Sequence, residues 1–359
     1  MRLTDICDFQ GGSQPPKDEW LFEKQEGYIR MLQIRDFTQS EKVVPEYVKI
    51  SKSTKICQAD DILIARYGAS IGKILTGLSG AYNVAIMRAI PDTHMLQKKY
   101  LYYYLKSPYF QTAILNVGSR AAQAGFNKED LSKLEIKCPL LSEQDSIIDI
   151  LQKVESIIGK RKKELIFLGE LVKARFVEMF GTLHDNENGF DIVTIEDVCS
   201  LIKDGTHQTP QYTEDKKEGY KFLSSKDVMS QKVDWTNIKY IPAELHEKLY
   251  ATIKPQRNDI LMSKNGVNYG VAAVNDTDEV FDIYVSLALL RPKKIIDPVF
   301  LKCVINNPET KWQFDSSIKG IGVPNLHLGE IKKTRMFLPP IELQNQFADF
   351  VRAIDKSKV

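Results

Sequence analysis

The chain has 359 residues, 43% hydrophobic and 27% charged, which is an ordinary composition for a globular protein. Its formal net charge of +2 excludes a basic surface over the whole molecule, so any DNA-binding surface must be a local patch or be shared with a partner. No apolar run approaches the roughly 18 residues that a membrane span needs, and no apolar signal segment opens the chain. We therefore expect no membrane partner and a cytoplasmic location.

The five cysteines are widely spaced, which indicates reduced thiols rather than disulfides or a zinc site. They are Cys7, Cys57, Cys138, Cys199 and Cys303.

The first half of the chain opens with a loop rich in glycine, proline and polar residues. Short alternating segments such as residues 61–65 then predict strands, and residues 97–106 predict a helix that stops near Pro108. More loop and a last short strand end at Pro139. Short strands mixed with one or two helices predict an α/β or α+β domain of roughly 140 to 160 residues.

A long helix is predicted next, beginning with a capping-box-like pair at Ser142 and Asp145 and ending near Gly181. Such a helix measures about 58 Å at about 1.5 Å per residue. Its apolar residues recur in steps of four and three, which predicts a heptad seam that needs a partner helix. The seam residues are Ile147, Leu151, Val154, Ile158, Leu165, Leu168 and Val172, followed by Met179.

The second half repeats the first. GYIRMLQIRD at Gly27 corresponds to GYKFLSSKDV at Gly219, and DILIARYGASIGK at Asp61 corresponds to DILMSKNGVNYGV at Asp259. The offset is 192 at the first block and 198 at the second, and it settles at 200 further on. Six such matches in order predict a duplicated domain. The offset-200 pairs include Leu101 with Leu301, Pro108 with Pro308, and Pro139 with Pro339.

The second half therefore has the same coarse prediction, including a helix over residues 298–305 and a strand that ends at Pro339. A final helix follows with the spacing of the long helix, at Leu343, Phe347, Phe350 and Ile354. If a pseudo-twofold axis relates the halves, the two helices meet antiparallel as a two-helix coiled coil. The predicted parts are residues 1–141, 142–181, 182–340 and 341–359.

The run from Leu141 to Gly181, LSEQDSIIDILQKVESIIGKRKKELIFLGELVKARFVEMFG, resembles the central conserved region of type I restriction–modification specificity subunits. KDGTHQTPQY at Lys203, DILIARYGASIGK at Asp61 and GFNKEDL at Gly125 resemble motifs of that family's target-recognition domains. The resemblance covers essentially the whole chain. In one respect the chain departs from the family, since its distal helix, residues 341–359, is shorter than usual; either the chain is truncated or the native protein is short.

The resemblance implies that each recognition domain reads one half of an asymmetric, bipartite site on double-stranded DNA. It implies that the helices fix the gap between the halves and dock two methyltransferase subunits, to which nuclease–translocase (restriction) subunits can be added. The specificity subunit itself is then no enzyme, with no catalytic residue, metal or cofactor. S-adenosylmethionine, ATP and Mg²⁺ belong to the partner subunits.

Base edges are read mostly in the major groove by polar and basic side chains, which loops carry well on a rigid domain. Three loops in each half hold such residues in similar places. The candidates of the first half are Ser13, Gln14, Lys17, Arg66, Tyr67, Ser70, Arg120, Gln123 and Asn127. Those of the second half are Thr206, His207, Gln208, Thr209, Lys264, Asn265, Asn268, Tyr269, Lys319 and Asn325. Each of these taken alone is also an ordinary turn residue.

Other functions stay open at this point. Pro91-Asp92 with Glu135-Ile136-Lys137 imitates the PD…ExK pattern of metal-dependent nucleases, and Ser107-Pro108-Tyr109-Phe110 imitates an adenine methyltransferase motif. The basic run Lys160–Lys163 is a candidate phosphate contact or a solvated helix face. A coiled-coil scaffold that binds no DNA is the third alternative.

Overall fold

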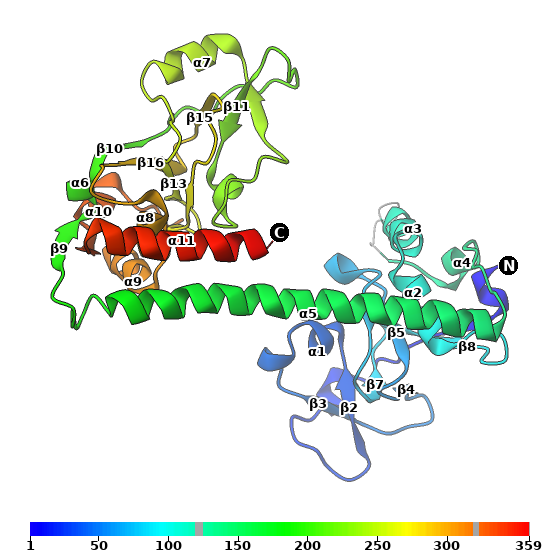
Figure 1. Cartoon of the computed structure of the whole chain (residues 1–359). Helices are drawn as coiled ribbons and strands as arrows, with labels where there is room; N and C mark the ends of the chain where they lie inside the picture. The colour runs from blue at the N-terminus through cyan, green and yellow to red at the C-terminus, as the bar shows by residue number, and fades with distance from the viewer. Residues whose placement is uncertain (119–124, 319–322, 359) are drawn as a thin grey trace. The chain divides into compact units, whose positions relative to one another are not determined.

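A computed structural model of the chain describes residues 1–118, 125–318 and 323–358 (Figure 1). The chain divides into two compact units, Met1–Arg161 and Lys162–Val359. Helix α5, Leu141–Phe180, is 40 residues long and crosses the boundary between them. The predicted mixed α/β architecture with a long central helix is confirmed.

Unit 1 contains two four-stranded sheets. The first is antiparallel, in the order β1-β8-β5-β6, with strands Cys7–Gly11, Ile86–Pro91, Ile62–Ala65 and Ile74–Leu75. The second has the order β3-β2-β7-β4, with strands Glu46–Lys49, Tyr28–Leu32, Gly80–Tyr82 and Ile56–Cys57. The helices of this unit before α5 are α1 (Ile34–Thr38), α2 (Lys98–Lys106), α3 (Pro108–Gly118) and α4 (Lys128–Leu131).

Unit 2 repeats this plan. Its four-stranded sheet has the order β10-β16-β13-β14, with strands Cys199–Asp204, Leu287–Pro292, Ile260–Ser263 and Ala272–Val274. A three-stranded sheet, β12-β11-β15, is formed by Lys239–Ile241, Tyr220–Leu223 and Phe281–Ile283, and β9 (Asp191–Thr194) pairs with β17 (Arg335–Leu338). The helices are α6 (Ile195–Val198), α7 (Ala243–Tyr250), α8 (Pro298–Ile305), α9 (Pro308–Ser317), α10 (Leu328–Lys333) and α11 (Ile341–Ser357).

The duplication is visible in the buried charges as well as in the strand order. Asp61, just before β5, and Asp259, just before β13, are both buried, and each accepts a hydrogen bond from the backbone N–H three residues earlier at 2.8 Å. Arg88 lies 3.0 Å from Asp61, and Arg291 lies 2.8 Å from Asp259. A buried carboxylate needs such partners, and both units provide them in the same way.

A buried glutamine joins each unit to the helix that follows it. Gln144, in the first turn of α5, accepts a backbone N–H at 2.9 Å and donates to two backbone carbonyls at 2.7 and 2.9 Å. Gln344, in the first turn of α11, accepts at 2.9 Å and donates at 2.7 and 3.2 Å. The partners occupy matching positions: Gln97, Met95 and Pro139 for Gln144, and Asp297, Ile295 and Pro339 for Gln344.

The prediction of loop after Pro108 and Pro308 is wrong. Each proline begins a further helix, α3 or α9, rather than only ending the one before it. Proline lacks an N–H but suits the first turn of a helix, where that N–H has no intrahelical partner. In α9 the Asn307 side chain caps the start by accepting the N–H of Glu309 at 2.9 Å.

Within unit 2, α11 runs antiparallel to the carboxyl-terminal part of α5 (Figure 1). The Phe347 ring lies 5.5 Å from both the Phe176 and the Phe180 ring, and 6.3 Å from that of Phe300 on α8. This aromatic cluster is buried in the largest core of the unit, with Val351 beside it. Neither Phe176 nor Phe180 is in the predicted seam, because the contact face follows steps of four along this part of α5.

The predicted seam is thus correct only in part. Val172 and Leu343 pack against the core of unit 2, and Phe347 belongs to it. Leu151, Leu168, Phe350 and Ile354 are half-buried. Four predicted seam residues are exposed in the structure: Ile147, Val154, Ile158 and Leu165. Further apolar residues of α5 are exposed as well, namely Ile150, Ile157, Ile166, Phe167, Leu171 and Val177.

The cysteines are free thiols, and Cys7, Cys57 and Cys199 are buried. Burial raises the pKa of Cys7 and Cys199 to about 12 and that of Cys303 to about 11. Protonated thiols are poor nucleophiles and poor metal ligands. Among the described helices, none combines the length and apolarity that a bilayer span requires.

Candidate nucleic-acid interface

The opening loops leave β1 and β10 at a glycine that has no room for a side chain. A Cβ on Gly12 would collide with the carbonyl oxygen of Asn83, and one on Gly205 would collide with that of Ile283. The next residue is tied down in both units, since Ser13 N–H donates to Tyr82 at 3.0 Å and Thr206 N–H donates to Ile283 at 3.2 Å. The two loops therefore start from equivalent, fixed points.

In unit 1 the opening loop presents Gln14 and Lys17 to solvent. Ser13 is half-buried, and its hydroxyl accepts the N–H of Lys55 at 3.3 Å. Lys17 starts a short 3-10 turn, Lys17–Glu19. Gln14 and Lys17 are thus free to meet a ligand, while Ser13 positions the loop.

In unit 2 the opening loop exposes His207, Gln208 and Thr209, whereas Thr206 is half-buried. The Thr206 hydroxyl accepts the N–H of Gln208 at 3.3 Å, which turns the chain outward. The His207 ring lies 3.3 Å from a carboxylate oxygen of Asp204, at the end of β10. The loop therefore presents one imidazole and one amide, both able to hydrogen-bond base edges.

The second loop of unit 1 follows β5. The Arg66 guanidinium donates to the Phe126 carbonyl at 3.2 Å and lies 5.0 Å from the Tyr67 ring centroid. Tyr67 is exposed and forms an isolated β-bridge with Gly125, and Ser70 is half-buried in the turn Gly68–Ser70. Tyr67 thus presents its ring to solvent from a backbone that is held in place.

The second loop of unit 2 follows β13, and here two candidates are buried. Lys264 is 4% exposed and forms an ion pair with Asp204 at 3.0 Å. Tyr269 is buried in the core, donates its hydroxyl to Asp315 and has Lys311 3.8 Å from its ring centroid. We correct the expectation for both residues, because neither side chain reaches the surface. Asn268 is exposed and Asn265 is half-buried.

The third loops are described only in part. Arg120, Gln123 and Lys319 lie outside the described residues. Asn127 is exposed, but its side chain caps α4 by accepting the N–H of Asp130 at 3.0 Å. Asn325 forms a β-bridge with Asn265, so the second and third loops of unit 2 are joined.

Asp204 is a residue that the sequence reasoning missed. Its carboxylate lies between the buried Lys264 ammonium and the exposed His207 ring, and so links the first loop of unit 2 to the second. A signal was present, since Asp204 is the acidic residue of the KDGT block. Its role was hidden because Lys264 is 60 positions away in the sequence.

A pocket of about 420 Å³ lies beside Thr206 and His207. One of its walls carries Asp282, whose carboxylate lies 2.7 Å from Nδ1 of the buried His246, and the Tyr220 ring stacks on that imidazole at 3.7 Å. Burial raises the pKa of Asp282, although the contact with His246 opposes this rise. The Asp282 carboxylate and the His246 imidazole are bonded to each other within the fold, so we assign them a structural role beside the opening loop of unit 2.

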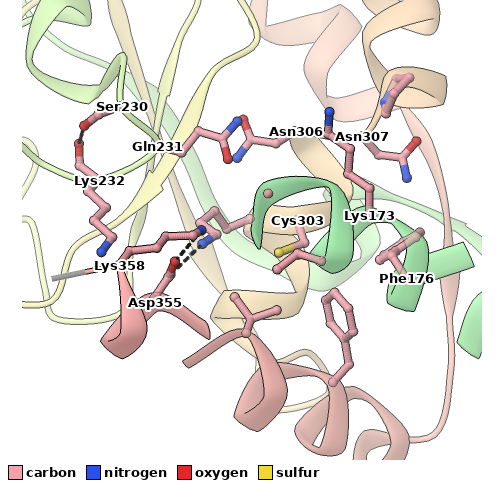
Figure 2. A pocket seen from close by; sticks show the side chains of 16 residues that line it. Lys173, Phe176, Ser230, Gln231, Lys232, Cys303, Asn306, Asn307, Asp355 and Lys358 are labelled. Carbon is pink, nitrogen blue, oxygen red and sulfur yellow. Dashed lines mark hydrogen bonds and ion pairs between the residues drawn. The ribbon is translucent and has the colours of Figure 1, made fainter. Parts of the chain in front are cut away.

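A second pocket of unit 2, of about 320 Å³, lies where α5, α8 and α11 approach one another (Figure 2). Figure 2 shows Lys173 and Phe176 of α5, Cys303 of α8 and Asp355 of α11 around it. Lys358 donates to Asp355 at 2.9 Å. Burial opposes ionisation of Asp355, but Lys358 and Lys302 outweigh it and hold the pKa of this carboxyl below its usual range. The charged side chains that line this pocket therefore stabilise the end of α11.

The nuclease-like pattern does not form a metal centre in the described structure. The Asp92 carboxylate accepts the N–H of His94 at 3.0 Å in a turn, and Glu135 takes part in a backbone bridge with Arg2. Over residues 1–118, 125–318 and 323–358, no three His, Cys, Asp or Glu side chains gather as a metal would require. In the methyltransferase-like motif, Ser107 precedes α3 and Phe110 is buried core.

Tyrosines 102–104 lie on α2 and make contacts within unit 1. The Tyr103 hydroxyl donates to Glu155 on α5 at 2.8 Å, and the Tyr104 ring packs edge-on against Phe110 at 5.8 Å. In the basic run on α5, Lys160, Lys162 and Lys163 are exposed, as both a phosphate contact and a solvated helix face require.

Known proteins resemble this chain over most of its length. The profile of the family "Type I restriction modification DNA specificity domain" matches residues 1–166 and 187–359. The "Type I restriction enzyme MjaVIII specificity subunit" of Methanocaldococcus jannaschii is 22% identical over 99% of this chain and 85% of its own length. The EcoBI specificity subunit of Escherichia coli is 23% identical over 76% of this chain, and the match spans 64% of that protein.

Solved structures show the same fold. The S subunit of a type I restriction–modification system from M. genitalium has a TM-score of 0.54 at 13% identity, covering 100% of this chain and 89% of its own. A chain from a structural study of type I R-M complex assembly has a TM-score of 0.50 at 16% identity, covering 100% of this chain and 90% of its own. The family profile matches both repeats, and the two units each contain the paired loops described above. The chain therefore belongs to the family of type I restriction–modification DNA specificity subunits.

Proposed function

We propose that this chain reads a bipartite, asymmetric DNA site for a type I restriction–modification complex, with one half-site for each unit. One observation carries this proposal: both units present polar loops from equivalent anchors. The loops leave β1 and β10 at Gly12 and Gly205, where the backbones approach closely. Loops that are fixed at their base and exposed at their tip suit base readout, because little conformational entropy is lost on binding.

The side chains that we assign to DNA contact are those exposed at the loop tips. In unit 1 they are Gln14, Lys17 and Tyr67, and in unit 2 they are His207, Gln208, Thr209 and Asn268. Their amide, imidazole and hydroxyl groups match the donors and acceptors of the major groove. The buried side chains of Lys264 and Tyr269 hold the second loop of unit 2 in place through their bonds to Asp204 and Asp315.

We propose further that α5 binds two methyltransferase subunits, to which restriction subunits can be added. The apolar side chains exposed along α5, such as Ile157, Ile166 and Phe167, support this role. Exposed apolar residues that follow one another along a helix favour burial against a protein partner. The chain itself then supplies recognition and no catalysis, and its partners hold S-adenosylmethionine, ATP and Mg²⁺. We place the complex in the cytoplasm, with the DNA that it reads.

Helix α5 also connects the two reading units, so we propose that its length sets the gap between the half-sites. A helix of 40 residues is about 60 Å long at about 1.5 Å per residue. That length corresponds to about 18 base pairs, at about 34 Å for each ten-base-pair turn of DNA. We therefore expect a change in the length of α5 to change the spacing of the half-sites.

Replacement of Thr206, His207 and Gln208 together by alanine is expected to weaken specific binding far more than non-specific binding. Each lost base contact costs about 1–3 kcal/mol, whereas the phosphate contacts that hold random DNA remain. The site is first mapped by methylation sequencing in a host with and without the gene. Binding of the assembled complex to that site and to a random duplex is then measured at one fixed salt concentration.

The matched control replaces His184, Glu187 and Asn188 by alanine. These side chains are also exposed in unit 2, but they lie in the connection between α5 and β9. The control complex is expected to keep its specific binding. An equal loss on specific and random DNA for the Thr206–Gln208 variant would show that this loop contacts phosphate or supports the fold, and would contradict base reading.

A further inference from the structure

The second and third loops of unit 2 form one small ribbon. Asn265 pairs with Asn325 in an antiparallel bridge. On either side of that bridge, the Gly266 N–H donates to the Pro324 carbonyl at 3.0 Å, and the Leu326 N–H donates to the Lys264 carbonyl at 2.7 Å. The ribbon therefore projects from the end of β13 as a single unit.

Two valines lie at the tip of this ribbon. Val267 directly follows Gly266, and Val323 directly precedes Pro324, so both adjoin the same hydrogen-bonded pair. Val267 is 83% exposed and Val323 is 80% exposed, the highest values for large apolar side chains among the described residues. Two such side chains at one loop tip leave apolar surface in water that a ligand could cover.

The backbone at the base of the ribbon has a fixed conformation. Gly266 has a φ of +87°, a left-handed conformation that glycine adopts readily. The buried Ser263 hydroxyl donates to the Asn268 carbonyl at 2.8 Å and accepts the Val271 N–H at 3.0 Å, which closes the turn. Valine has few side-chain rotamers. The apolar tip is therefore preorganised, and contact with it costs little entropy.

The surroundings of the valines favour DNA as the ligand. The exposed Asn268 amide lies in the same turn, and Asp204 connects the ribbon through Lys264 to the loop that carries His207. In the major groove, thymine is the base that presents a methyl group, and small apolar side chains contact it. We infer that Val267 and Val323 recognise the 5-methyl group of thymine in the half-site read by unit 2, an inference that rests on the proposed function.

The test compares thymine with deoxyuridine, which lacks only the 5-methyl group. Duplexes carry the mapped site with each thymine of both half-sites replaced in turn, and binding of the assembled complex is measured. Uridine at one or two positions of a single half-site is expected to weaken binding about three- to tenfold, the effect of removing one or two buried methyl contacts. Replacement of Val267 and Val323 by alanine should weaken binding to the thymine duplex by a similar factor and abolish its sensitivity to uridine.

Val280→Ala is the matched control. This valine is 42% exposed in unit 2 and directly precedes β15, two residues after Asp278 of the Arg257–Asp278 ion pair. The control complex is expected to bind the thymine duplex normally and to keep the uridine effect. Because the uridine series uses the unaltered protein, the result does not depend on the folding of any variant.

The remaining outcomes separate this inference from the proposed function. Specific binding with no uridine effect in either half-site, or half-sites without thymine, would overturn methyl recognition and leave the proposed function intact. Binding no tighter than to a random duplex would overturn the proposed function itself. Loss of the methyltransferase subunits from the alanine variant on gel filtration, with the uridine effect unchanged, would identify the tip as a protein contact and also overturn the inference.

Discussion

Deletion of residues 160–166 from α5 is expected to move methylation to sites whose spacer is shorter by two or three base pairs. One heptad removes about 10 Å of helix, which is the length of about three base pairs. The apolar pattern stays nearly in phase, since seven residues make almost two full turns, with a drift of about 20°. Three base pairs turn the duplex by about 100°, so binding to the original site should fall sharply.

Methylation sequencing in cells that carry the deletion measures both half-sites and their spacing at once. The half-sites should be unchanged, because neither set of reading loops is altered. A duplication of the same seven residues is the matched control and should lengthen the spacer by a similar amount. A folded, active deletion variant that kept the original spacer would contradict the proposal that α5 sets this distance.

Phe347→Ala is expected to lower the free energy of unfolding of unit 2 by about 3–5 kcal/mol, the usual cost of removing a buried phenylalanine ring. Phe347 is 0% exposed and lies among the rings of Phe176, Phe180 and Phe300. The cavity would weaken three helices together, because those rings come from α5 and α8 while Phe347 comes from α11. Recognition of one half-site should then be lost before the other as temperature rises.

Urea denaturation of the full chain measures this effect, with a midpoint for unit 2 lower by roughly 1–2 M. Phe167→Ala is the control, because Phe167 lies on α5 in the same unit but is 69% exposed. Its change in stability should stay within about 0.5 kcal/mol, as is usual for surface substitutions. If the two variants unfolded alike, the aromatic cluster would not be the feature that holds α11.

The duplication and the long helix were predictable from sequence because both are repeated patterns. Asp61 and Asp259, or Gln144 and Gln344, recur at fixed spacing, and a helix as long as α5 shows its period many times. The contact face of α11 was less predictable. Val351 is buried although the predicted seam passes through Phe350, because packing against α5 and α8 decides which neighbouring residue points inward.

The candidate loops were predictable as sets, whereas the roles of single residues were not. Lys264 is a residue of the type that contacts DNA, yet its ion pair with Asp204 keeps its side chain inside the fold. Tyr269 is likewise held by Asp315, 46 positions further along the chain. Such pairings join residues that are distant in sequence, so local composition cannot reveal them. Val267 was overlooked for the opposite reason, since apolar residues are expected inside.

The joint made by Gln144 and Gln344 has a consequence for how such chains diversify. Each glutamine bonds three main-chain groups of its recognition unit, one N–H and two carbonyls, and Gln144 also donates to the Cys138 thiol at 3.8 Å. Main-chain groups are present whatever the side chains are, so the unit can change its sequence without losing these hydrogen bonds. A gene exchange whose boundary lies just before the helix would replace the recognition unit and leave the helix, with its glutamine, unaltered. New DNA specificity would then arise in one recombination event, provided that the incoming unit also keeps side-chain contacts with the helix such as that of Tyr103 with Glu155.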